Sequence, residues 1–364
     1  MRQLGISIYP QHSSEERDFS YMELAARYGF KRIFTCLMCV DKTHERFHEE
    51  FLRFTNKAHE LGFTVTADTN PSVFEFLGAS ADNLRPFAEI GLDILRLDWN
   101  LGGRADIAIT HNRYGIKIEF NASSDLDLEH LIRHGADLGN MVVCHNFYPQ
   151  RYTGLSMRSF KIFNKKWAAQ GLHTAAFVSS NNSGTFGPWP VSAGLPTLEE
   201  HRGLPIGLQA RHMLSCGVVD DVIIGNAFAA EAELAELSRV DLSKTTVRVT
   251  PETDISEEER RILFDFEHSG RTDASEYFIR SSLTRGKGGG KGILPRDSNK
   301  ELFSRGDVLI VNDSLTHYYG ELEIVLRDMQ NDGERNLAGR INMPELMILD
   351  RMEENPDHFF ALLP

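Results

Sequence analysis

Two stretches of sequence decide the fold prediction: Asp93-Ile-Leu-Arg-Leu-Asp-Trp-Asn100 and Ile116-Lys-Ile-Glu-Phe-Asn-Ala122. In both, polar and apolar residues alternate, which is the period of a β-strand whose two faces meet different surroundings. A segment of helical length separates them. The pair therefore indicates a strand–helix–strand unit.

The same unit repeats along the chain to about residue 238. Eight strands that alternate with helices over about 230 residues predict a (β/α)8 TIM barrel, an α/β fold. An open doubly wound sheet is the competitor, but it usually carries a Gly-rich turn after its first strand, and here that turn reads Tyr9-Pro-Gln-His-Ser13. The predicted strands are 4–9, 31–37, 64–70, 93–100, 116–122, 141–148, 173–180 and 220–226.

Helix signals lie between the predicted strands. Within 43–61, Phe47, Phe51 and Phe54 recur at helical spacing, and Gly62 follows at the expected helix end. Glycines fall just before a strand, where a helix C-cap is expected, at Gly29, Gly62, Gly91, Gly115, Gly171 and Gly217.

The pattern changes after about residue 240, and we predict two domains: a catalytic barrel over 1–240 and a smaller β-rich domain over 241–364. In the second, 245–251 alternates like a strand and 255–267 has a helical pattern. Further strand-like runs are 277–283, 307–312 and 320–327.

Charge and cysteine content restrict the partners and the compartment. The 364 residues carry a formal net charge of −13, which argues against nucleic acid or an anionic membrane as a partner. The N-terminus does not resemble a signal peptide, because Pro10 interrupts its short apolar stretch. Four cysteines in so long a chain suggest a reducing compartment, so a cytoplasmic protein is expected.

Three consecutive predicted strands carry an acid-x-Asn motif near their C-terminal ends. On the middle one, Leu95, Leu97 and Trp99 take the opposite face, which suits contact with helices. The polar faces should therefore point toward the barrel axis, at the end where active sites of such barrels lie. The motifs are Asp68-x-Asn70, Asp98-x-Asn100 and Glu119-x-Asn121.

Two interpretations of these carboxylates compete. They could form interior ion pairs, Arg96 with Asp98 and Lys117 with Glu119. However, burying charges costs free energy even when they are paired, so three such motifs in a row favour a site. On neighbouring strands, Asp98 and Glu119 could approach the separation of about 5 Å that retaining glycosidases use.

Three other motifs resemble metal or phosphate sites but fit poorly. His44-Glu-Arg-Phe-His48 matches H-E-x-x-H, yet its helix mainly covers the barrel and no third ligand is suggested. Cys36-x-x-Cys39 lacks a second pair, and Gly286-Lys-Gly-Gly-Gly-Lys-Gly292 lacks P-loop spacing. We therefore expect no metal and no cofactor.

The loops after the last three barrel strands favour a sugar ligand. His145-Asn-Phe-Tyr148 lies at the end of the predicted sixth strand, and a segment rich in Ser, Asn and aromatic residues, 179–190, follows the seventh. Aromatic and hydroxyl-binding side chains together suit sugar faces. Asn226 follows the eighth strand, and loops seven and eight form the usual barrel phosphate site.

Several long motifs, in order, resemble a bacterial family of 6-phospho-N-acetylmuramidases, formerly a domain of unknown function or "outer surface protein". In the barrel they are Arg96-Leu-Asp-Trp-Asn100, Lys117-Ile-Glu-Phe-Asn-Ala-Ser123, His145-Asn-Phe-Tyr-Pro149 with Tyr152-Thr-Gly-Leu-Ser156, and Gly194-Leu-Pro-Thr-Leu-Glu-Glu-His-Arg202. In the second domain, Gly306-Asp-Val-Leu-Ile-Val-Asn312 and Tyr319-Gly-Glu-Leu-Glu-Ile324 match a cyclophilin-like domain. The resemblance covers essentially the whole chain.

The resemblance implies a cytoplasmic glycosidase of peptidoglycan recycling. Its substrate would be a phosphorylated amino-sugar disaccharide, 6-phospho-N-acetylmuramyl-N-acetylglucosamine, cleaved at the β-1,4 bond. From the strand argument we predict Asp98 and Glu119 as the carboxylate pair, without assigning acid and base, and Asp68 as a group that polarises the 2-acetamido group. The predicted substrate-binding residues are Tyr9, Asn70, Asn100, Asn121, His145, Asn146, Tyr148, Asn226 and Arg296. Arg296 stands in a basic segment with Arg285, Lys287, Lys291 and Lys300 and is a phosphate candidate, as is the Gly225-Asn226 turn.

Two rival functions stay open from the sequence. One is a sugar-phosphate aldolase or epimerase that uses Lys117 as a Schiff base or proton shuttle. The other is a non-catalytic sugar-binding protein. The stereochemical outcome and the formation of a homo-oligomer are also left open.

Overall fold

The computed structural model describes residues 2–38, 46–124, 126–286, 292–355 and 358–364. The chain divides into two compact units, Met1–Ala210 with Gly217–Arg239, and Arg211–Cys216 with Val240–Pro364. Each unit is described by itself below.

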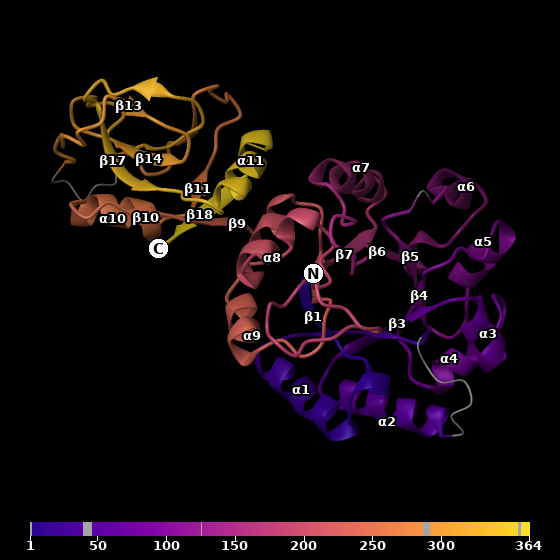
Figure 1. The fold of residues 1–364 in the computed structure, drawn as a ribbon. Coiled ribbons are helices and arrows are strands. Elements are labelled where there is room, and N and C mark those ends of the chain that lie inside the picture. The colour runs from indigo at the N-terminus through magenta and orange to yellow at the C-terminus, as the bar shows by residue number, and fades with distance from the viewer. Residues whose placement is uncertain (1, 39–45, 125, 287–291, 356–357) are drawn as a thin grey trace. The chain divides into compact units, whose positions relative to one another are not determined.

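The first unit contains a closed barrel of eight parallel strands in sequence order (Figure 1), which confirms the predicted TIM barrel. All eight strands were predicted, and each of them ends earlier than expected. The strands are β1 (Gln3–Ser7), β2 (Arg32–Cys36), β3 (Thr64–Thr69), β4 (Ile94–Leu97), β5 (Lys117–Asn121), β6 (Met141–Cys144), β7 (His173–Val178) and β8 (Asp221–Ile224).

Helices follow the strands and cover the outside of the barrel (Figure 1). The six glycines expected at helix ends all have positive φ. The helix predicted over 43–61 is observed from Phe47 onward, and residues 43–45 lie outside the described part. The helices are α1 (Glu15–Arg27), α2 (Phe47–Glu60), α3 (Pro71–Leu77), α4 (Arg85–Glu89), α5 (Arg104–Thr110), α6 (Leu128–Arg133), α7 (Met157–Ala168), α8 (Ile206–Ser215) and α9 (Glu231–Ser238), with 3-10 turns η1 (Pro10–His12), η2 (Leu138–Asn140) and η3 (Glu199–His201).

Strand alternation sorts the side chains as expected. On β4, Leu95 and Leu97 are buried on the apolar face that meets the helices. Trp99, predicted to share that face, is 68% exposed because β4 already ends at Leu97. On the barrel interior, Asp68 pairs in register with Arg96, and Arg96 with Glu119, so these three charges lie at one level across β3, β4 and β5.

The second unit is rich in β-strands. A five-stranded sheet has the order β10-β17-β14-β15-β12, a three-stranded sheet has the order β11-β18-β9, and β13 pairs with β16. The strands are β9 (Thr245–Arg248), β10 (Thr250–Pro251), β11 (His268–Ser269), β12 (Phe278–Ser281), β13 (Leu302–Phe303), β14 (Asp307–Val311), β15 (Leu322–Val325), β16 (Met329–Gln330), β17 (Arg335–Arg340) and β18 (Phe359–Leu363), with helices α10 (Glu257–Phe264) and α11 (Leu346–Glu354).

Candidate active site

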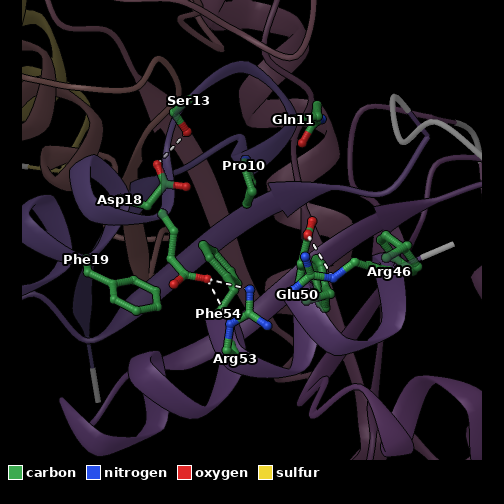
Figure 2. A pocket seen from close by; sticks show the side chains of 12 residues that line it. Pro10, Gln11, Ser13, Asp18, Phe19, Arg46, Glu50, Arg53 and Phe54 are labelled. Carbon is green, nitrogen blue, oxygen red and sulfur yellow. Dashed lines mark hydrogen bonds and ion pairs between the residues drawn. The ribbon is translucent and has the colours of Figure 1, made fainter. Parts of the chain in front are cut away.

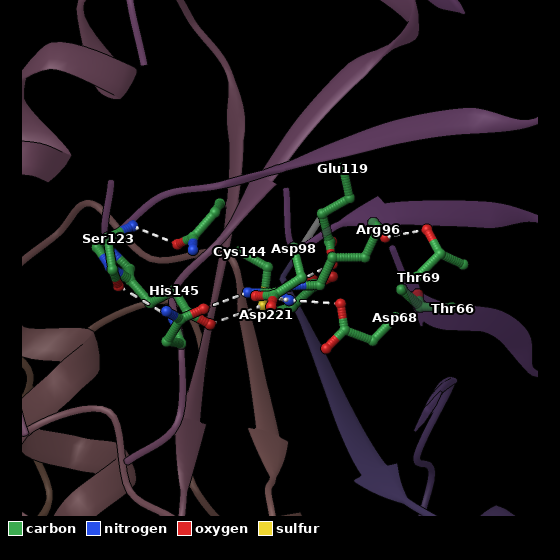
Figure 3. A network of polar contacts seen from close by, with 12 residues as sticks. Thr66, Asp68, Thr69, Arg96, Asp98, Glu119, Ser123, Cys144, His145 and Asp221 are labelled. Atoms are coloured by element: carbon green, nitrogen blue, oxygen red, sulfur yellow. Dashed lines mark hydrogen bonds and ion pairs between the residues drawn. The ribbon is translucent and has the colours of Figure 1, made fainter. Parts of the chain in front are cut away.

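Three carboxylates surround the guanidinium of Arg96 inside the barrel, toward the C-terminal ends of β3, β4 and β5 (Figure 3). Its Nη1 lies 2.7 Å from Oδ1 of Asp68 and 3.3 Å from Oδ1 of Asp98. Its Nε lies 4.0 Å from Oε1 of Glu119. The structure thus brings together the three predicted catalytic carboxylates, and we call Asp68, Arg96, Asp98 and Glu119 the Arg96 cluster.

The carboxylates of the cluster differ in exposure. The Asp98 side chain is 41% exposed, because it follows the end of β4 at the barrel mouth. Asp68 is buried, and Glu119 is sealed completely from solvent. Asp98 is therefore the carboxylate that a ligand entering the barrel would meet first.

A second guanidinium, that of Arg32, contacts the cluster from the side of the N-terminal ends of the strands, because Arg32 is the first residue of β2. It forms an ion pair with Glu119, and its Nη1 lies 2.9 Å from Oδ2 of Asp221 on β8. Its Nε also donates to Oγ1 of Thr66 at 3.1 Å. Space for this long side chain comes from Gly5 on β1, where a Cβ would meet the Cβ of Arg32 at 3.2 Å.

Carboxylates outnumber guanidiniums in this part of the barrel interior, and the pKa of Asp68 is raised. Arg32 and Arg96 together face Asp68, Asp98, Glu119 and Asp221. Burial raises the pKa of Asp68 to about 7, although the charge of Arg96 opposes this rise. A buried carboxyl with such a pKa holds a proton near neutral pH and can deliver it.

The loop after β6 closes one side of the cluster through Asn146. The Arg96 Nη2 donates to Oδ1 of Asn146. The Asn146 N–H donates in turn to Oγ of Ser123 at 3.0 Å. Asn146 and Tyr148 are partly exposed, and their binding of a ligand stays a prediction.

His145, predicted to bind a sugar hydroxyl, is instead enclosed. Its Nδ1 lies 3.0 Å from Oγ of Ser123, and its Nε2 lies 3.0 Å from Nδ2 of Asn164. Burial lowers the pKa of His145 to about 3, so the ring is neutral at physiological pH. In this arrangement His145 supports the loop that carries Asn146.

Other predicted binding residues make contacts within the barrel unit. The Asn70 side chain caps α3 by accepting the Val73 N–H at 3.1 Å, and that of Asn121 accepts the Ser123 N–H at 2.9 Å. The buried Tyr9 hydroxyl donates to the Gly225 carbonyl at 2.6 Å. Asn100 is exposed in the loop after β4.

Arg296 lies in the second unit and is held there by two acids. Its Nη1 donates to Asp254 at 2.7 Å, and its Nη2 donates to Glu259 at 3.1 Å. Of the neighbouring basic residues, Arg285 pairs with Glu321 and Lys300 with Asp307, while Lys287 and Lys291 lie outside the described residues. Phosphate binding by this segment stays a prediction.

Lys117, the alternative Schiff-base residue, lies at the opposite end of the barrel. It is the first residue of β5 and is exposed. It lines a cavity of about 360 Å³ at the N-terminal end, together with Arg32, His173 and Asp221. Of the two ion pairs in the alternative interpretation, Arg96–Asp98 is present, whereas Glu119 pairs with Arg32 in place of Lys117.

A polar cavity of about 460 Å³ lies among the loops that follow β6, β7 and β8. We call it the rim cavity. Asn226, a predicted ligand residue, lines it, but its Oδ1 accepts the Ser180 N–H at 2.8 Å and its Nδ2 donates to the Ser180 carbonyl at 2.9 Å. The lining residues are Arg151, Ser179–Thr185, Val191–Gly194, Arg202, Gly203 and Asn226.

The amides next to the rim cavity are already bound by an internal anion, Glu233 at the start of α9. Its carboxylate accepts hydrogen bonds from the Ser180 hydroxyl at 2.5 Å, from the Asn181 N–H at 2.9 Å and from the Ala230 N–H at 2.9 Å. The usual barrel cradle for phosphate at this helix start is therefore filled by a side chain of the protein.

A further cavity, of about 570 Å³, lies between the starts of α1 and α2 (Figure 2). Burial raises the pKa of its carboxyl Asp18 to about 6, and the Ser13 hydroxyl donates to this carboxyl at 2.5 Å. Arg53 pairs with Glu15 at 2.9 Å. The Arg96 cluster is the better candidate for chemistry, because it lies toward the C-terminal ends of the barrel strands, where active sites of such barrels lie.

The metal-like motifs are only partly described: His44, Glu45 and Cys39 lie outside the described residues, and Cys36 is buried. Among the residues that the structure does describe, no group of three or more His, Cys, Asp or Glu side chains could hold a metal ion.

Sequence reasoning did not single out Arg32, Asp221, Ser123 or Asn164. The signal for Arg32 was present, because alternation in Lys31-Arg-Ile-Phe-Thr-Cys36 places it on the inner face with Phe34. Asp221 likewise shares the inner face of β8 with Ile223. Ser123 and Asn164 act through contacts between distant elements, which spacing does not reveal.

An eight-stranded barrel with clustered carboxylates at its C-terminal end is the arrangement of many barrel glycosidases. Sequence models of the 6-phospho-N-acetylmuramidase family match this chain, the N-terminal model over residues 4–239 and the C-terminal model over 245–361. The chain belongs to this family of glycosidases.

Two solved structures resemble the whole chain. An uncharacterized protein from B. cereus is 39% identical, covers 100% of this chain and 99% of its own, and has a TM-score of 0.89. A conserved protein of unknown function from Enterococcus faecalis is 27% identical, covers 99% of this chain and 96% of its own, and has a TM-score of 0.67. No curated protein gives a significant match.

No described helix has the length and apolar character needed to cross a membrane.

Proposed function

We propose that this protein hydrolyses the β-1,4 bond of 6-phospho-N-acetylmuramyl-N-acetylglucosamine, a cytoplasmic step of peptidoglycan recycling. The family membership supports the glycosidase class and the phosphorylated muramyl substrate. The observation that carries the proposal is that Asp68 and Asp98 share one nitrogen of Arg96 while differing strongly in burial.

This difference suits the two roles that glycoside hydrolysis requires. Asp68, with a pKa near 7, donates its proton to the glycosidic oxygen as the bond from that oxygen to the anomeric carbon breaks. Asp98, at the mouth, faces the anomeric carbon either directly or through a water molecule. Arg96 holds both carboxyl groups in place.

Glu119 takes a supporting role in this proposal, whereas the strand pattern alone pairs it with Asp98. It is fully buried and forms an ion pair with Arg32, so a ligand would reach Asp98 first. Its negative charge, 4.0 Å from Nε of Arg96, orients that guanidinium.

We also propose that the second unit has the cyclophilin-like fold that its motifs imply.

Product analysis tests the function directly. The purified full-length chain is incubated with the 6-phosphorylated disaccharide and with its unphosphorylated form, and released N-acetylglucosamine is measured. Asp98→Asn and Asp68→Asn should each lower kcat by about 10²- to 10⁴-fold, the usual contribution of a positioned acid or base. Glu119→Gln should lower it less, because Glu119 acts through Arg96.

Asp82→Asn is the matched control, since Asp82 is an exposed carboxylate between α3 and α4. It should keep wild-type turnover. Release of no N-acetylglucosamine from either disaccharide would reject the proposed function. Near-wild-type turnover by both Asp98→Asn and Asp68→Asn would reject the proposed site while leaving the glycosidase class intact.

A further inference from the structure

The side chains that line the rim cavity include positive charges, in a chain whose net charge is −13. Among the described residues that line it, two are arginines, Arg151 and Arg202, and none is an aspartate or glutamate. The hydroxyl-bearing residues Ser183, Thr185 and Ser192 also line it. Such a lining suits an anion, which arginines and neutral donors can bind together.

The two arginines are not equivalent. Arg202 is largely buried, and its Nη2 lies 2.6 Å from Oε2 of Glu199. The Arg202 hydrogen bond lowers the pKa of Glu199 to about 2, so this pair is ionised and internally neutral. Arg151 is exposed and forms no ion pair with any residue in the described ranges. Of the two arginines that line the rim cavity, Arg151 is therefore the one whose guanidinium is open to an external anion.

One loop joins this charge to the Arg96 cluster. Asn146, which accepts a hydrogen bond from Arg96, begins the segment, and Arg151 ends it. The Nη2 of Arg202 donates to the carbonyls of Tyr148 at 3.0 Å and Gln150 at 3.2 Å, and this fixes the course of the loop. A ligand bound at the carboxylates can therefore extend toward Arg151 along an ordered segment.

We propose that the rim cavity binds the phosphate monoester of the substrate and that Arg151 is the residue that selects phosphorylated over unphosphorylated sugar. This inference rests on the proposed function for the identity of the substrate. Glu233 already binds the amides near the start of α9, so recognition depends on side chains, chiefly the Arg151 guanidinium. A planar guanidinium with two parallel donors fits a phosphate dianion.

The test combines kinetics with direct binding. Arg151→Ala, Arg151→Lys and wild type are assayed on both disaccharides, with Arg158→Ala as the control for an exposed arginine on the adjacent α7. Arg151→Ala should raise KM for the phosphorylated substrate roughly 10- to 100-fold, the usual range for a charge-assisted hydrogen bond. Its kcat and its turnover of the unphosphorylated substrate should stay near wild type, and Arg151→Lys should fall in between.

Binding of inorganic phosphate, followed by ³¹P NMR or calorimetry, gives a readout that does not depend on turnover. Phosphate should bind wild type and Arg158→Ala, and should bind Arg151→Ala at least tenfold more weakly. D-Lactate is the comparison ligand, because it is an anion that carries a carboxylate in place of a phosphate. It should bind no more weakly to Arg151→Ala than to wild type. Lactate binding that depends on Arg151, with phosphate binding unchanged, would overturn the assignment to phosphate.

The outcomes separate this inference from the proposed function. Phosphate binding that requires Arg151, without any disaccharide hydrolysis, would support the anion site and reject the hydrolase proposal. Disaccharide hydrolysis with equal KM for wild type and Arg151→Ala, and no effect of the substitution on phosphate binding, would reject the role of Arg151 and retain the hydrolase.

Discussion

Asp68 and Asp221 are two buried carboxyl groups in the same barrel, one toward each end. Asp68 shares Arg96 with two other carboxylates, and burial raises its pKa to about 7. Burial also acts to raise the pKa of Asp221, but His173 at 2.9 Å and Arg32 at 2.9 Å outweigh it and lower that pKa. The local ratio of cations to carboxylates, rather than burial alone, thus decides which carboxyl keeps a proton.

The largest expected effect on stability comes from removing Arg32, whose guanidinium pairs with Glu119 and with Asp221. Arg32→Met removes this guanidinium, and the free energy of unfolding should fall by about 3–5 kcal/mol. Urea unfolding at pH 7 measures this. Lys117→Met, an exposed cation at the same end, should change it by less than about 0.5 kcal/mol. Equal losses in the two variants would contradict a special role for Arg32.

The pH dependence of stability should have opposite signs at the two carboxyls. Asp68 has a raised pKa in the folded state, so its stabilising contribution is complete below about pH 4 and is lost as the pH rises through 7. Asp221 has a lowered pKa, so its contribution is present above about pH 4 and is lost as the pH falls through the folded value. Unfolding of Asp68→Asn and Asp221→Asn between pH 3 and 8 should therefore deviate from wild type in different pH windows.

The same proton sets the activity profile. If Asp68 is the acid, kcat should decline above about pH 7, approaching tenfold per pH unit. Asp221→Asn should leave this limb in place if it folds. A rate that stays constant from pH 6 to 9 would exclude Asp68 as the proton donor.

The smallest effect is expected at Lys117. Because it begins β5 at the N-terminal end, Lys117→Ala should keep kcat/KM within about twofold of wild type. Borohydride added with the phosphorylated disaccharide should trap no adduct in the wild-type chain. A trapped lysine adduct that Lys117→Ala abolishes would revive the aldolase or epimerase hypothesis.

The barrel was predictable because its signal is local. Alternation and glycine spacing placed all eight strands, and the acid-x-Asn motifs brought Asp68, Asp98 and Glu119 into one cluster as expected. The second unit was harder, because β9 pairs with β18, more than a hundred residues later, and neither strand carries information about its partner. β9 lies within the predicted strand 245–251, whereas β18 and β17, the partner of β14, were not predicted.

The role of a side chain could be predicted from the sequence only where its position on one face of a strand determines that role. Asn70 and Asn121 matched a ligand pattern, but each binds a backbone N–H two or three residues ahead, which is a common local use of asparagine. The choice of Arg32 over Lys117 as the partner of Glu119 depends on reach across the barrel interior, since β2 and β5 are not neighbours. Spacing along one strand could not provide that choice.

Glu233 has a consequence for the thermodynamics of recognition. By tying the backbone after β7 to the start of α9, its carboxylate fixes loop conformations during folding rather than during ligand binding. A preorganised loop loses less conformational entropy on association. Glu233→Asp shortens this side chain and should therefore lower the affinity for the ligand, because the loop becomes more mobile. Calorimetry would record the change mainly as a less favourable entropy of binding.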